Sequence, residues 1–145
     1  MKIILGADHG GFEMKEEVKK WLVAKGFTVE DVGADTLTPG DDFVYYGKEA
    51  IKAVTSSGDR VILFCRNGFG MMIAANRFVG TRCGLAFNPE AVSKGRTDDD
   101  INCLAVPADY LELEKAKEMI DIFLTEEVSR EEKYKRRVMK LDNLI

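Results

Sequence analysis

The sequence has little of what marks several large classes of protein. Its 145 residues include one histidine, three cysteines, three prolines and one tryptophan. No stretch approaches the roughly 18–20 apolar residues of a membrane-spanning helix. The apolar run after Met1 is too short for a signal peptide. We therefore expect a cytoplasmic protein that does not enter a membrane.

The few cysteines also exclude some architectures. Cys65, Cys83 and Cys103 are odd in number and contain no Cys-x-x-Cys pair. A disulfide framework and a zinc site are both poorly supported by this pattern. Buried, reduced thiols are the simplest interpretation, and we predict no metal site.

The charge balance argues against a general nucleic-acid binder. The chain carries 21 basic and 25 acidic residues, a net charge of −4, whereas nucleic-acid binding favours a basic surface. One basic cluster lies at 133–137. It is either a solvated helix face or, because Lys133 and Arg137 are four residues apart on one side of a helix, a grip for a phosphate.

Strand and helix patterns alternate along the chain. Strands are predicted at 2–7, 27–32, 60–65, 82–87 and 101–106, and helices at 12–25, 43–54, 71–78, 89–95, 111–124 and about 129–141. Alternation of this kind is typical of an α/β fold with a parallel sheet and helices on both faces. No linker or repeat interrupts it, so we expect a single domain over residues 1–145.

Ligands of such sheets bind where the strands end, near a switch in strand order. The loop after the first predicted strand is Asp8-His9-Gly10-Gly11. Its two glycines allow the backbone to approach a ligand closely, and a helix follows that can host an anion. The alternative is that Asp8 only caps that helix and His9 is a surface residue.

The loop after the third predicted strand is Cys65-Arg66-Asn67-Gly68-Phe69-Gly70. It matches neither the Walker A loop nor the dinucleotide-binding fingerprint. Its glycines can still present backbone N–H groups to a phosphate or an oxyanion. A helix start nearby would lower the pKa of the Cys65 thiol and favour a reactive thiolate. The competing interpretation is a buried cysteine that merely completes a strand.

The triplet Asp98-Asp99-Asp100 resembles a metal-binding cluster only at first sight. Consecutive acids rarely converge on one ion, because the backbone points them apart. Loop solvation or helix capping is the simpler interpretation.

Several segments together resemble the family of type B ribose-5-phosphate isomerases and galactose-6-phosphate isomerase subunits. The matching segments are Lys2-Ile3-Ile4-Leu5-Gly6-Ala7-Asp8-His9-Gly10-Gly11-Phe12-Glu13-Met14-Lys15, Ile62–Cys65 with Gly68-x-Gly70, Ile73-Ala74-Ala75-Asn76-Arg77, Asn102-x-Leu104-Ala105 and Lys133-Tyr134-Lys135-Arg136-Arg137-Val138. The resemblance implies a three-layer α/β/α, Rossmann-like fold with a five-stranded parallel sheet. It also implies a homodimer or homotetramer whose active sites are shared between subunits.

The resemblance further implies an aldose–ketose isomerase that works on a small sugar phosphate through an enediolate, without metal or organic cofactor. Cys65 stands at the place of the family's cysteine base, while Met71 stands where another branch has a glutamate. Roles in sugar and phosphate binding or in the anion hole fall on Asp8, His9, Asp42, Asn67, Gly68, Phe69, Gly70, Lys133 and Arg137.

The sequence departs from the family pattern at the same site. The ring-opening His-Asn pair of the family falls on Asp98 and Asp99, and a phosphate-binding arginine falls on Asp109. The Cys-Gly-Thr-Gly segment is Cys65-Arg66-Asn67-Gly68 here, and Asp-Tyr-Pro is Asp42-Phe43-Val44.

A phosphate near Asp109 would be repelled unless Arg66 or Arg96 compensates. Arg66 alternatively points to solvent or pairs with an acid such as Asp98 or Asp99. Three functions remain open: a ribose 5-phosphate isomerase, an isomerase of a different or unphosphorylated sugar, and a non-catalytic sugar- or phosphate-binding protein.

Overall fold

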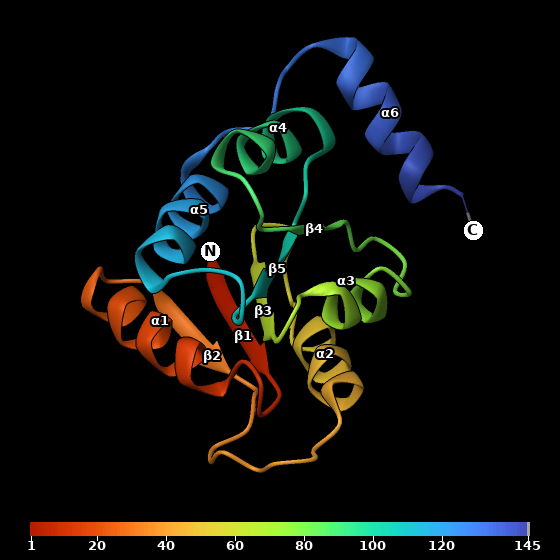
Figure 1. The fold of residues 1–145 in the computed structure, drawn as a ribbon. Helices are drawn as coiled ribbons and strands as arrows, with labels where there is room; N and C mark the ends of the chain where they lie inside the picture. The colour runs from red at the N-terminus through yellow and green to blue at the C-terminus, as the bar shows by residue number, and fades with distance from the viewer. Residues whose placement is uncertain (145) are drawn as a thin grey trace.

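The computed structural model describes residues 1–144 and is built on one five-stranded parallel sheet in the order β2-β1-β3-β5-β4 (Figure 1). The elements are β1 (Lys2–Ala7), α1 (Phe12–Ala24), β2 (Thr28–Asp31), α2 (Phe43–Lys52), β3 (Arg60–Cys65), α3 (Phe69–Ala75), β4 (Cys83–Leu85), α4 (Pro89–Asp99), β5 (Cys103–Pro107), α5 (Leu113–Thr125) and α6 (Glu132–Asp142). The predicted parallel α/β sheet is confirmed.

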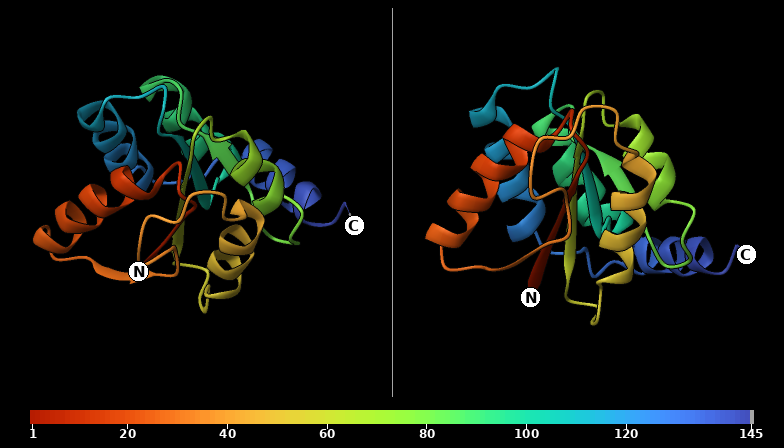
Figure 2. Two further views of the ribbon diagram at one scale, coloured as in Figure 1. Left: turned by 60° about the horizontal axis from the view of Figure 1, so that its bottom comes forward. Right: turned by 90° about the horizontal axis from the view of Figure 1, so that it is seen from below.

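The central strands are apolar because both of their faces are covered. β1, β3 and β5 are buried along almost their whole lengths. On one face, residues of α1, α4 and α5 pack around Phe64 and Leu104. On the other face, α2 and α3 pack around Leu63 and Ala105. Figure 2 shows α1 and α5 on one side of the sheet and α2 and α3 on the other, which gives the three layers.

Several helix boundaries differ from the sequence prediction, including those of α3, α4 and α6. α3 begins at Phe69, two residues before the predicted start, and α6 begins at Glu132 rather than near 129. α4 continues to Asp99, although we predicted a short helix ending at 95. Asp98 and Asp99 are therefore helical. Asp100 follows as the C-cap with a left-handed φ of 50°.

The last helix, α6, stands apart from the two cores. None of its residues is buried, and it lies against α4 at the outer edge of the molecule (Figure 1). Among residues 1–144, no helix combines the length and the apolar character needed to cross a membrane.

Candidate active site at the carboxyl end of the sheet

The switch in strand order lies between β1 and β3. These strands pair in parallel as far as Ala7 opposite Phe64, so the loops that follow them start side by side. The first loop carries Asp8 and His9, and the second begins at Cys65. In parallel α/β sheets, ligands bind at such a point.

His9 is held by an acidic residue from the loop between β2 and α2. Its backbone N–H donates to Asp41 Oδ1 at 3.0 Å, and its ring Nδ1 lies 2.8 Å from the same oxygen. Burial acts to raise the pKa of Asp41, but the hydrogen bonds from His9 outweigh it and lower this pKa below its usual value. An Asp41 carboxylate that accepts a ring N–H leaves the other ring nitrogen, Nε2, free to face a ligand.

The resemblance implies that Asp42 faces the sugar, which stays a prediction, whereas the acid that the structure brings to His9 is the neighbouring Asp41. Asp42 is exposed and is the N-cap residue of α2, without a side-chain capping bond. No motif distinguished the two adjacent aspartates. The other oxygen of Asp41, Oδ2, is buried without a hydrogen-bond partner among residues 1–144.

Asp8 turns back onto its own loop. Its Oδ1 accepts the backbone N–H groups of Gly10 at 3.1 Å and Gly11 at 3.3 Å. Burial nevertheless raises the pKa of Asp8. The negative charge of Asp8 also acts to raise the pKa of Cys65, so the two groups are electrostatically coupled.

The net pKa of the Cys65 thiol is raised, although the amides at the helix start act to lower it, as the sequence predicts. The residue is 5% exposed, and this burial raises the pKa of its thiol. Backbone N–H groups of Met71, Gly68 and Asn67 face the sulfur and act in the opposite direction, but burial outweighs them. The site therefore holds a thiol whose anion has hydrogen-bond donors already in place.

The loop from Asn67 to Gly70 is fixed by its own geometry. The side-chain oxygen of Asn67 accepts the N–H of Phe69 at 3.0 Å. Gly68 has a φ of 78°, and a Cβ there would lie 2.5 Å from a methyl group of Leu85. At Gly70 a Cβ would lie 2.8 Å from the ring of Phe43. Only glycine fits these two positions without movement of their neighbours.

Arg66 pairs with Asp109, a partner that the sequence analysis did not name. Arg66 Nη1 lies 3.3 Å from Asp109 Oδ2, and the N–H of Asp109 donates to the Arg66 carbonyl at 2.9 Å. Arg96 does not compensate Asp109, because it is buried against Asp100 and the Ile101 carbonyl. Arg66 therefore balances the charge of Asp109 locally.

Four predicted site residues lie on elements away from this loop cluster. Asp98 and Asp99 are on α4, where Asp98 accepts a hydrogen bond from Thr97. Lys133 and Arg137 are on α6, where both lie against the ring of Tyr134. Within one chain, the structure does not bring these four residues to Cys65.

One group of side chains has the spacing of a metal site. Single ligand atoms of Asp8, His9 and Asp41 lie within 4.8 Å of one another. The prediction of no metal site rests on the single histidine, the unpaired cysteines and the adjacent acids at 98–100, and no sequence pattern indicates that Asp41 lies beside His9. In the structure, His9 Nδ1 and Asp41 Oδ1 already bond to each other.

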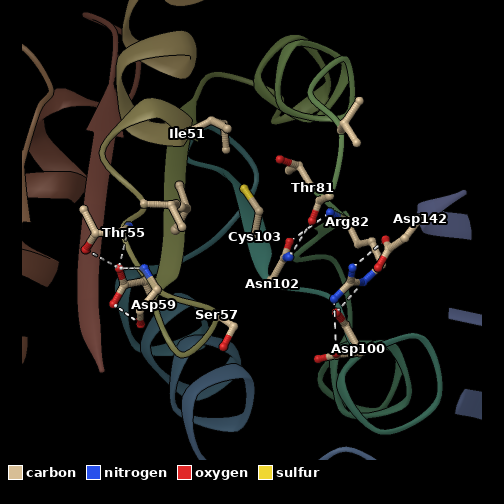
Figure 3. Close-up of a pocket in the computed structure, with 15 residues that line it drawn as sticks. Ile51, Thr55, Ser57, Asp59, Thr81, Arg82, Asp100, Asn102, Cys103 and Asp142 are labelled. Atoms are coloured by element: carbon tan, nitrogen blue, oxygen red, sulfur yellow. Dashed lines mark hydrogen bonds and ion pairs between the residues drawn. The ribbon is translucent and has the colours of Figure 1, made fainter. Parts of the chain in front are cut away.

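A cavity of about 610 Å³ lies at the opposite, amino-terminal end of the sheet. Its charged groups bond to one another (Figure 3): Arg82 pairs with Asp100 at 3.0 Å and with Asp142 of α6 at 2.7 Å. Asp59 accepts the N–H groups of Lys2, Thr55 and Ser56. These groups hold the fold together, so this cavity is not the candidate active site.

Known proteins match almost the whole length of this chain. The family model described as Ribose/Galactose Isomerase matches residues 3–141. Ribose-5-phosphate isomerase B of Escherichia coli is 36% identical over 85% of this chain and 83% of its own length. A 4-deoxy-4-sulfo-D-erythrose isomerase from a Clostridium species is 34% identical, over 86% of this chain and 79% of its own.

The crystal structure of a ribose 5-phosphate isomerase from Thermotoga maritima superposes with a TM-score of 0.92 at 35% identity. The match covers 99% of this chain and 98% of that one. The resemblance inferred from the sequence motifs is therefore confirmed.

Proposed function

Because the chain belongs to the ribose/galactose isomerase family, we propose that it converts an aldose phosphate into its 2-ketose through an enediolate, with Cys65 as the base. Isomerisation of sugar phosphates is the activity named for its relatives, and the protein is a sugar-phosphate isomerase. The cysteine mechanism and the choice of sugar are the parts that need testing.

The observation that carries the mechanism is the setting of the Cys65 sulfur. It ends β3 at the switch point and faces the backbone N–H groups of Asn67, Gly68 and Met71. A base must lie within hydrogen-bond reach of the proton that it removes. A developing oxyanion needs fixed donors, each worth about 2.7–4 kcal/mol in comparable sites. The Cys65 thiol can supply the base, and the neighbouring backbone N–H groups can supply the donors for the oxyanion.

The proposed step balances without an oxidant or a cofactor. The Cys65 thiolate takes the proton from C2 of the open-chain aldose, and the C1 oxygen becomes negative. The backbone N–H groups of Asn67, Gly68 and Met71 stabilise this enediolate. Cys65 returns the proton to C1, while the hydroxyl proton moves from O2 to O1, so the 2-ketose leaves with the same atoms. Met71, buried beneath the loop, cannot accept a proton.

The placement of α6 supports a shared site in an oligomer. Lys133 and Arg137 lie on a helix with no buried residue, so a second copy is needed to bring these cations to a Cys65 loop. Large apolar side chains on and beside α2 and α3 are exposed: Val44, Tyr45, Phe69, Ile73 and Val79. We place the dimer contact on this face. Sedimentation at micromolar concentration should show no dominant monomer.

The choice of sugar is open within the family. Ribose 5-phosphate is the first substrate to test, because it is named for several relatives. The relative named for 4-deoxy-4-sulfo-D-erythrose acts on a sugar with its anion at C4. The three buried, free cysteines favour a reducing compartment such as the cytoplasm for this reaction.

The experiment follows the isomerisation by proton NMR in deuterated water, over pentose, tetrose and hexose phosphates and the free sugars. We expect conversion of at least one sugar phosphate, with solvent deuterium entering at the carbon that receives the proton. A thermal-shift screen with the same compounds identifies binding, because a ligand stabilises the folded state. Binding without conversion of any sugar would favour a non-catalytic protein.

A further inference from the structure

A second, smaller cavity adjoins the switch-point loops. Its volume is about 390 Å³, and it is lined by His9, Gly10, Glu13, Leu37, Pro39, Arg66 and Asp109. Arg66 is the only lysine or arginine among these lining residues, whereas Glu13 and Asp109 are both acidic. A ligand with a terminal anion therefore has one strong attachment point here within the chain.

The Arg66 side chain is held in this cavity from two sides. A Cβ on Gly10 would lie 2.5 Å from Arg66 Cγ, so the stem of the arginine lies directly over the backbone of the first loop. At its end, the guanidinium is paired with Asp109. A guanidinium has five N–H donors in a planar fork. The remaining donors are free to bind an anion, and the side chain is 63% exposed.

Arg66 follows Cys65 directly in the chain, and its stem fills part of the space between the two loops, over Gly10. The loop after β3 therefore supplies both the proposed base and the cation that faces the cavity.

The acid–base groups limit the form of the substrate. A cyclic aldose must open before it isomerises, which requires a proton donor at the ring oxygen and a base at O1. Imidazole is the side chain suited to both tasks near neutral pH. His9 is the single histidine of the chain, so an assembly of identical copies brings no other kind of imidazole. His9 bonds to Asp41 and lines the same cavity as Arg66, at the anion end.

We infer that the substrate is a four-carbon aldose 4-phosphate, with Arg66 binding the phosphate and Asp109 holding the guanidinium in place. This inference rests on the proposed function. In such a sugar the C4 hydroxyl is esterified, so no five-membered ring can close and no ring-opening group is needed. Ribose 5-phosphate keeps its C4 hydroxyl free and is mostly a closed ring.

The first experiment measures initial rates with D-erythrose 4-phosphate and D-ribose 5-phosphate over a wide range of enzyme concentration. With erythrose 4-phosphate, the rate should stay proportional to enzyme concentration. With ribose 5-phosphate, it should level off at the rate of spontaneous ring opening. We expect kcat/KM to favour erythrose 4-phosphate by about tenfold or more, a difference of about 1.4 kcal/mol.

The outcomes separate this inference from the proposed function. A rate with ribose 5-phosphate that stays proportional to enzyme, together with the higher kcat/KM, would overturn the inference and leave the isomerase standing. Turnover of neither compound nor of any other sugar phosphate would refute the proposed function itself.

The second experiment removes the guanidinium but keeps much of the stem, by Arg66→Met. We expect KM for erythrose 4-phosphate to rise about tenfold with kcat within about twofold, since the lost contact is to the non-reacting end. Free erythrose closes to a ring through its C4 hydroxyl, so it is compared at enzyme concentrations where the rate stays proportional to enzyme, and both enzymes should then convert it equally. The control is Lys94→Met, an equal change of charge at an exposed position on α4. Equal losses on both sugars, or none, would mean that Arg66 does not bind the phosphate.

Discussion

The two ends of the sheet use the same kinds of side chain in opposite ways. At the amino-terminal end, Arg82 is 15% exposed and bonds to two aspartates. Asp59 accepts three backbone N–H groups and two hydroxyls. At the carboxyl-terminal end, the Arg66 side chain is 63% exposed and has a single acidic partner. Asp41 keeps one buried oxygen without a partner.

This difference shows that volume is a poor guide to the active site of this protein. The amino-terminal cavity is larger, at about 610 Å³ against 390 Å³, yet its main charged groups are already satisfied. Arg66, by contrast, is exposed and has one acidic partner, so its other donors mark the carboxyl-terminal end as the place where a ligand is expected. Variants at the two ends should accordingly separate catalysis from stability.

The largest effect is expected from Cys65→Ala. Without the sulfur, no group remains where the C2 proton is removed, and kcat should fall about a thousandfold or more, within the range that general-base catalysis and fixed geometry contribute. The measurement is the steady-state rate on the substrate identified by NMR. Circular dichroism and a melting curve check that the fold persists.

The control for this variant is Cys103→Ala, at the other end of the sheet. Cys103 is fully buried and borders the amino-terminal cavity. Its loss should lower the melting temperature and leave kcat almost unchanged. Wild-type kcat in Cys65→Ala would show that the sulfur is not the base.

A smaller effect is expected from pH alone. Burial raises the pKa of Cys65 in the protein without ligand, so at neutral pH the reactive anion is the minor form. kcat/KM should therefore rise with pH by about tenfold per unit until the thiol is ionised. The slope is measured from initial rates in overlapping buffers. A profile that is flat from pH 6 to above 9 would contradict a buried thiol as base.

Much of the fold was predictable from the sequence, because the buried strands are short apolar runs between glycine-rich turns. The Cys65 and His9 loops were also predictable, since both end strands beside a switch in strand order. Asp41 was not, because the fold of the 33–42 loop decides which of two adjacent aspartates meets His9. Neither was the Arg66–Asp109 pair, which joins residues 43 positions apart through the pairing of β3 with β5.

At the amino-terminal end of the sheet, Asp59→Ala should affect stability rather than catalysis. Asp59→Ala leaves the N–H groups of Lys2, Thr55 and Ser56 without their acceptor, and we expect a loss of about 2 kcal/mol in the free energy of unfolding. kcat should stay within about twofold, because no substrate contact is removed. Urea denaturation measures the first quantity, and Glu127→Ala, an exposed acid before α6, is the matched control.

Asp59→Ala and the natural protein should differ less in free energy of unfolding as the pH is lowered. Hydrogen bonds from Thr55, Lys2 and Ser56 lower the pKa of Asp59 below its usual value. A group whose pKa is lowered by folding stabilises the protein above its unfolded pKa and loses this contribution as the pH falls. If Asp59→Ala lowered kcat as much as Cys65→Ala does and left stability unchanged, the amino-terminal end would be catalytic rather than structural, contrary to this prediction.

The smallest effect is expected from chelation, which tests whether the Asp8–His9–Asp41 group works as a metal site. Asp8 Oδ1 accepts N–H groups from Gly10 and Gly11, and His9 Nδ1 bonds to Asp41 Oδ1. The proposed mechanism uses His9 as a polar wall of the anion cavity and needs no metal. Prolonged dialysis against EDTA should therefore leave kcat and KM unchanged. Activity that disappears on dialysis and returns with one divalent cation, but not with others, would show that this group is a metal centre. The backbone N–H groups would then not be the sole stabilisers of the enediolate.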